Sequence, residues 1–278
     1  MSSDRAMGLA SLFAMALTGA IFLPKLLTPD SELYRDVLTP DRILLVAAPI
    51  KLLFLFVGAL YASRSAASFE SDNPVRSAWI LLASGLWAYV AAQSVLGFYQ
   101  LVLGEDAPFP SVADLFFLPA TVLLAMSLFR FLKVYRSVGF EVAEWFEVGL
   151  VLLFALSLLA VFFLVVARPV LESEAPFAER ALNIAYPVLD CILLVPAVLL
   201  SKMALSMRGG SLWKVWMGLL LGFLFLAMGD ILFAFFTTLG ESALDPLLDL
   251  AFAWAYILIA RAVVTQHGIV VGVSGRLG

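Results

Sequence analysis

Residues 212–239 read LWKVWMGLLLGFLFLAMGDILFAFFTTL and decide the fold class of this chain. A helix needs about 20 predominantly apolar residues to cross the hydrocarbon core of a bilayer. This run exceeds that length, and Asp230 is the one charged residue in its interior. The stretch therefore predicts a transmembrane helix that carries an acidic side chain within the membrane.

Seven further apolar runs lie along the 278-residue chain. They cover residues 6–25, 43–63, 78–103, 113–132, 147–167, 182–204 and 247–264. The composition agrees, because 63% of the residues are hydrophobic and 14% are charged, whereas a soluble domain has roughly 45–50% and about 25%. We therefore expect an all-α integral membrane bundle of eight transmembrane helices. Residues 1–266 would form this single domain, and residues 267–278 a short cytoplasmic tail.

The first run, 6–25, could instead be a signal peptide, because Arg5 precedes it and small residues follow its apolar core. However, the run is longer than the roughly 7–15 residues of a signal core, and residues 18–20 make a poor cleavage site. We expect this helix to be retained.

Basic residues are distributed unequally between the two sets of connections, with eleven on the side of the chain termini and five on the other side. Cytoplasmic loops are enriched in Lys and Arg. We therefore expect a multi-pass protein of the cell membrane with both termini in the cytoplasm. The eleven are Arg5, Arg64, Arg76, Arg130, Lys133, Arg136, Lys202, Arg208, Lys214, Arg261 and Arg276. The five are Lys25, Arg35, Arg42, Arg168 and Arg180.

An aspartate recurs near or inside the outer half of every helix predicted to run from outside to inside. These are Asp41, Asp114, Asp190 and Asp249, and a proline lies three or four residues before the last three of them. The pattern suggests repeated αα-hairpins, which in membrane bundles place polar sites at repeat interfaces. Coincidence explains it equally well, and helix capping offers a structural role for all but Asp190.

Four polar residues in different spans reach one depth: Lys51, Gln93, Asp190 and Asp230. At 1.5 Å per residue they fall roughly 12–15 Å below the outer surface. A charged group that faces lipid at that depth costs at least about 2.5–3.5 kcal/mol. We therefore predict that Lys51 bridges Asp190 and Asp230 in the bundle interior, with Gln93 at the edge.

The candidate ligand-binding residues are this layer together with Asp114, Asp249 and Tyr186. The layer could be a structural cluster that fixes helix register. It could equally bind a ligand, a proton or an ion, because ionisable residues within membrane spans mark functional sites.

Several functions need residues that the chain lacks. The one histidine, His267, lies near the C terminus, so a Ser-His-Asp triad within the bundle is excluded. The one cysteine, Cys191, excludes an internal disulfide and a cysteine-rich metal site. No lysine follows Lys214, whereas an opsin needs one in its last helix. We expect no cofactor and no metal.

Two short motifs, Pro110-Ser-Val-Ala-Asp114 and Tyr186-Pro-Val-Leu-Asp190, resemble a known bacterial module. It is the polytopic membrane region found before diguanylate cyclase (GGDEF) domains. The resemblance covers about residues 78–266 and implies an input module that passes a helix movement to a cytoplasmic domain. Because no such domain follows Arg261, it implies a standalone copy that acts through a partner chain.

We therefore expect a non-enzymatic sensory or accessory membrane protein that binds a small ligand, lipid or ion from the outer side. Its partners would be membrane lipid and a cytoplasmic or membrane protein, with no nucleic acid. One alternative is a small proton- or ion-coupled transporter. Another is a lipid-modifying membrane enzyme that uses Asp190 and Asp230.

Overall fold

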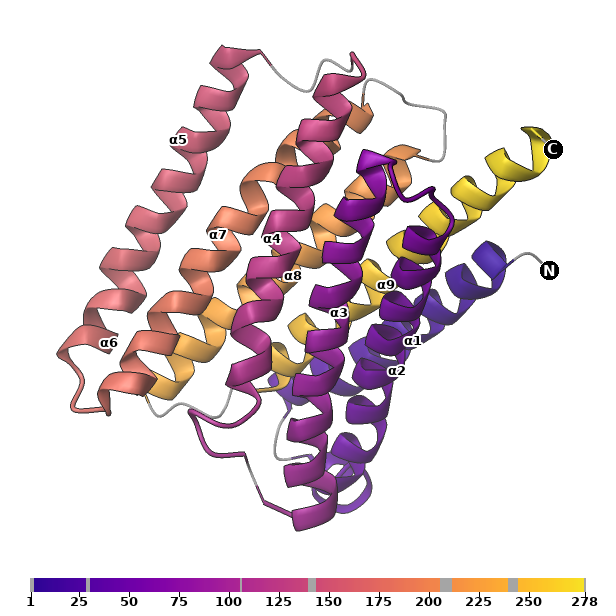
Figure 1. Ribbon diagram of the computed structural model, residues 1–278. Coiled ribbons are helices and arrows are strands. Elements are labelled where there is room, and N and C mark those ends of the chain that lie inside the picture. Colours follow the sequence, from indigo (N-terminus) through magenta and orange to yellow (C-terminus); the bar gives the residue numbers. More distant parts are fainter. Residues whose placement is uncertain are drawn as a thin grey trace.

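The computed structural model describes residues 3–28, 31–105, 107–139, 144–205, 212–239 and 245–277, and these residues form helices and connections without any strand (Figure 1). The long helices are α1 (Ser3–Leu27), α2 (Pro40–Ala67), α3 (Pro74–Phe98), α4 (Asp114–Ser137), α5 (Trp145–Phe162), α7 (Phe177–Leu205), α8 (Leu212–Leu239) and α9 (Asp245–Leu277). The short ones are the π-helical turns η1 (Leu33–Val37), η2 (Tyr99–Leu103) and η3 (Phe163–Ala167), and the helix α6 (Arg168–Glu172).

Seven of the described helices are long and apolar enough to cross a membrane, namely α1, α2, α3, α4, α7, α8 and α9. The prediction of an all-α bundle with the apolar helices of a multi-pass membrane protein is thus confirmed. The fifth predicted span corresponds to α5, which is not among these seven helices. The helix continues to Phe162 and then into η3.

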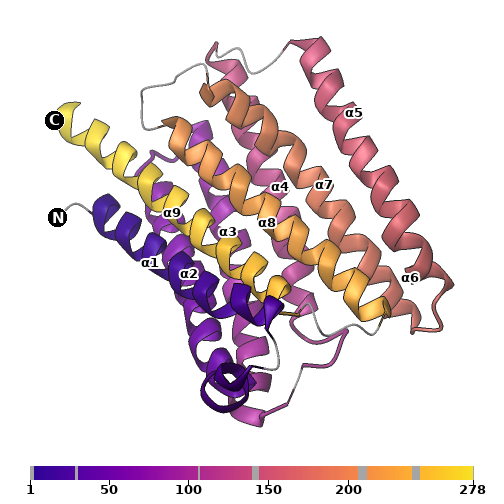
Figure 2. The same ribbon diagram turned by 180° about the vertical axis from the view of Figure 1, so that it is seen from behind.

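Neighbouring helices in the chain pack side by side through most of the bundle, and α9 lies among α1, α2 and α8. Helix α5 stands at one edge, where it packs on α7 (Figures 1 and 2). Helix α1 contributes to the core, since Phe22 is only 1% exposed. The hairpin repeat stays a prediction, and the side chain of Asp41 lies outside the described residues.

The first and last helices meet at one end of the bundle, where Thr265 Oγ1 of α9 donates a hydrogen bond to Asp4 of α1 at 2.7 Å. We call this the terminal end, and the opposite end the distal end. Helix α4 ends at the terminal end and α7 begins at the distal end, so α5 runs the length of the bundle between them (Figure 1).

Helix α9 continues beyond the predicted span 247–264 as far as Leu277, so the described part of the expected tail is helical. At the terminal end the helix packs on α2. There the ring of His267 lies against Tyr61, with centroids 5.3 Å apart, and its Nδ1 lies 3.3 Å from Ser65 Oγ.

Candidate functional site

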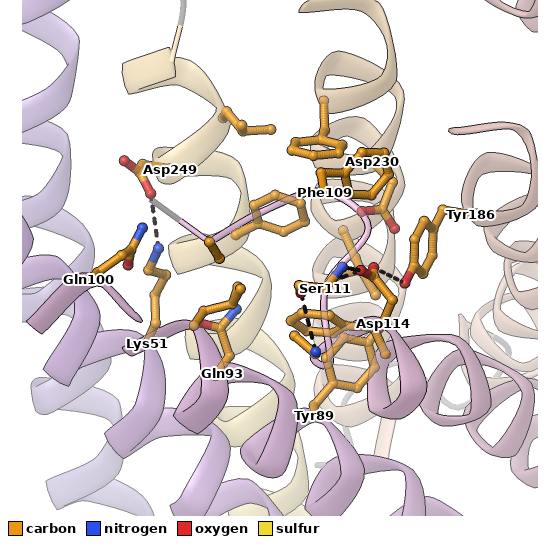
Figure 3. A pocket seen from close by; sticks show the side chains of 18 of the residues that line it. Lys51, Tyr89, Gln93, Gln100, Phe109, Ser111, Asp114, Tyr186, Asp230 and Asp249 are labelled. Atoms are coloured by element: carbon orange, nitrogen blue, oxygen red, sulfur yellow. Dashed lines mark hydrogen bonds and ion pairs between the residues drawn. The ribbon is translucent and has the colours of Figure 1, made fainter. Parts of the chain in front are cut away.

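A cavity of about 260 Å³ lies at the distal end, lined by α2, α3, α4, α7, α8 and α9. The connection between α3 and α4 covers it and contributes residues between 107 and 113 (Figure 3). Six of the seven predicted site residues line this cavity: Lys51, Gln93, Asp114, Tyr186, Asp230 and Asp249. The seventh, Asp190, lies behind the wall.

The predicted bridge from Lys51 to Asp190 and Asp230 is wrong. Lys51 Nζ instead donates to Asp249 Oδ1 at 2.9 Å, and the two side chains are 11% and 44% exposed. A lysine stem is long and extends its ammonium group toward the wetter end of a helix. Estimating depth from the Cα position ignored this reach and placed the charge too deep.

Asp114 has hydrogen-bond donors from two directions. Tyr186 Oη of α7 donates to its Oδ1 at 2.7 Å. The backbone N–H of Ser111 donates to its Oδ2 at 2.6 Å. Asp114 therefore holds the start of α4 and also ties α4 to α7. Both donors are neutral, so the carboxylate has no counter-charge from them.

The carboxyl groups of Asp190 on α7 and Asp230 on α8 are neighbours. Asp190 is 1% exposed, and no described residue donates a hydrogen bond to either of its oxygens. Asp230 lines the cavity and Asp190 does not. One carboxyl is thus available to a bound molecule, and the second stands directly behind it.

Aromatic rings form much of the remaining wall. The rings of Tyr89 and Tyr256 lie 6.0 Å apart, and Gln93 Nε2 donates to Tyr256 Oη at 3.1 Å. Phe109, from the covering connection, packs edge to face on Phe233 at 4.9 Å. Sequence reasoning missed these rings.

A signal for part of the aromatic wall was present in the sequence. Asp249, Phe252 and Tyr256 are spaced three and four residues apart, which places them on one face of a helix. Tyr89 and Gln93 are likewise four residues apart. Phe109 carried no such signal, because it lies in a connection without helical periodicity.

The two polar groups lie on opposite sides of the cavity, with Phe109 between them (Figure 3). On one side are Lys51 and Asp249; on the other are Asp114, Tyr186 and Asp230. The second side has carboxyl groups but no basic residue among the described lining residues. Within the described part of the chain, no group of three or more His, Cys, Asp or Glu could hold a metal ion.

No protein-family model, curated protein or solved structure matches this chain. The resemblance to the membrane region found before diguanylate cyclase domains therefore stays a prediction. Its two motifs contribute Asp114, Tyr186 and Asp190, which the fold brings to one side of the cavity or directly behind it.

Proposed function

We propose that the chain is a multi-pass membrane sensor or accessory module that binds a small ligand in the distal cavity. The observation that carries this proposal is the course of α9. Its first turns supply Asp249, Phe252 and Tyr256 to the cavity wall, and the same helix ends beside the N terminus at the opposite end (Figure 1). One continuous helix therefore joins the cavity to the terminal end.

The proposed topology has eight crossings, with α5 as the eighth. Two observations support it: α1 and α9 meet at one end, and α5 runs the length of the bundle between α4 and α7. The excess of basic residues on the terminal side favours a cytoplasmic terminal end. The cavity would then face the outside of the cell.

A bound ligand can transmit a signal only through contacts that differ between two states. We propose the Lys51–Asp249 pair as this contact, because it joins α2 to α9 at the cavity. A ligand that weakens or strengthens the pair would bias α9 toward a different position. Shifts of about 1–2 Å along packed helices are a common signalling movement. The terminal half of α9 would carry this shift to a partner.

The first test asks whether the cavity binds anything at all. A library of cationic, anionic, zwitterionic and neutral small molecules is screened for thermal stabilisation of the protein in nanodiscs. We expect stabilisation of the wild type that is lost in Ala107→Trp, which fills the cavity from its lining. The matched control is Val138→Trp, at an exposed position of the terminal end. If no compound distinguishes the wild type from Ala107→Trp, the proposal fails.

A proton- or ion-coupled carrier is the second candidate, favoured by the buried carboxyl of Asp190 behind Asp230. Uptake into proteoliposomes that follows an imposed pH gradient and is lost in Asp230→Asn would support it. The enzyme alternative gains no support from the geometry. Paired catalytic aspartates must both face the substrate, and of the predicted pair Asp190 and Asp230 only Asp230 lines the cavity.

A further inference from the structure

The geometry points to a small organic cation as the ligand of the distal cavity. Its ammonium group would bind at Asp114 and Asp230, and its apolar part would pack on the aromatic wall. This inference rests on the proposed function, because it names the chemical class of the molecule that the cavity binds.

The distribution of charge is the first reason. Among the described residues that line the cavity, Lys51 is the one cation, whereas Asp114, Asp230 and Asp249 are acids. Lys51 pairs with Asp249 on the far side. This pair also shows that the cavity accommodates an ammonium group against a carboxylate. Neither Asp114 nor Asp230 has a cationic partner among the residues that the structure describes.

Asp190 is the second and independent observation. It is almost fully buried, neither of its oxygens has a hydrogen-bond donor among the described residues, and its carboxyl group neighbours that of Asp230 from behind. A buried carboxylate without a partner is costly. A cation placed on the cavity side of Asp230 would lie close to both carboxyls and relieve that cost, whereas an anion would increase it.

The wall favours an organic cation over a hydrated metal ion. Hard cations such as Ca²⁺ need about 6–8 oxygen ligands gathered around one point, and among the described residues no group of three or more His, Cys, Asp or Glu could hold a metal ion. Ring faces attract an ammonium group and also pack on apolar groups. The rings of the lining are Tyr89, Phe109, Phe117, Tyr186, Phe233, Phe252 and Tyr256.

The size of the cavity limits the ligand. Its volume of about 260 Å³ lies below the roughly 300–1,000 Å³ of pockets for drug-sized molecules. The connection that covers it, with Phe109 packed on Phe233, leaves room for a small molecule between the Lys51–Asp249 pair and the Asp114–Asp230 side. A single ring with a short ammonium arm matches this space.

The test compares three probes that share one ring and differ in charge: benzylammonium, benzyl alcohol and benzoate. Binding to the full chain in nanodiscs is measured by calorimetry at constant ionic strength. We expect benzylammonium to bind roughly tenfold or more tightly than benzyl alcohol, because charge-assisted hydrogen bonds to carboxylates are the stronger kind. We expect no binding of benzoate.

Variants locate the charge that is recognised. Asp230→Asn should lower the affinity for benzylammonium by roughly tenfold and leave benzyl alcohol unaffected. Asp72→Asn removes the same charge from an exposed position between α2 and α3. It should change the affinity for neither probe. If Asp230→Asn does not fold, Asp114→Asn serves the same purpose. The series of three probes on the wild type needs no variant at all.

Two outcomes would overturn the inference. One is that benzyl alcohol or benzoate binds as tightly as benzylammonium or more tightly. The cavity would then bind ligands, but with another specificity. The other is benzylammonium binding that persists unchanged in both Asp230→Asn and Asp114→Asn. Failure of the proposed function would give a different result. In the Ala107→Trp screen, no compound of any charge would then stabilise the wild type more than the variant.

Discussion

Lys51 and Asp249 show how one ion pair joins two helices at a partly wet site. The lysine is the more deeply buried partner, so loss of the ion pair costs Lys51 more than it costs Asp249. The position of Lys51 deep within an apolar span correctly predicted that its side chain faces the bundle interior. Its partner could not be predicted, since the direction of a side chain around the helix axis is set by packing.

Asp249→Asn should destabilise the protein by about 1–3 kcal/mol, because it leaves a mostly buried ammonium without its counter-charge. Lys51→Met should cost less, since Asp249 is half exposed and reaches water. The double variant should recover part of the loss. Equilibrium unfolding in mixed micelles measures all three. Additive effects in the double variant would contradict a direct interaction.

At the scale of whole helices, close packing depends on small residues. A Cβ on Gly222 of α8 would lie 2.6 Å from Ile259 Cγ1 and 3.1 Å from the backbone oxygen of Ala255, both on α9. Small residues allow membrane helices to approach closely. This contact holds α8, which carries Asp230, against the helix that carries Asp249.

Gly222→Ala should lower stability by about 1–3 kcal/mol, because the added methyl group meets backbone atoms that cannot move aside. Gly149→Ala in α5 is the matched control, since nothing lies within 4 Å of its added Cβ. There the higher helix propensity of alanine should be neutral or stabilising by up to about 1 kcal/mol. Thermal unfolding in detergent compares the two variants. Equal effects would show that the close approach is unimportant.

The extent of α9 could not be predicted from hydropathy. The apolar run ends near Val264, where Thr265, Gln266 and His267 follow. The helix nevertheless continues, because these residues are not helix breakers and no proline follows them. By contrast, the predicted span 212–239 coincides with α8 at both ends.

At the scale of the whole molecule, the topology depends on whether α5 crosses the membrane. Val138 follows the end of α4, and Glu174 lies just before α7. If α5 crosses the bilayer, these two positions face opposite sides. The excess of positive charge at the terminal end predicts that Glu174 faces the outside.

This topology can be tested with single cysteines in a Cys191→Ala background, which removes the natural thiol. In intact cells, a membrane-impermeant maleimide should label Glu174→Cys. It should label Val138→Cys only after the membrane is permeabilised. Labelling of both positions from one side would contradict a crossing by α5. The reverse pattern would keep the crossing and invert the proposed orientation.

The sequence by itself determined that the chain is an apolar helical bundle and which polar residues turn inward. Both follow from one physical fact, the high cost of placing polar groups in hydrocarbon, which acts on each segment separately. The tertiary structure alone decided which inward residues meet. Lys51 pairs with Asp249 and Asp190 stands behind Asp230, because helix rotation, side-chain reach and the covering connection with Phe109 depend on contacts between distant segments.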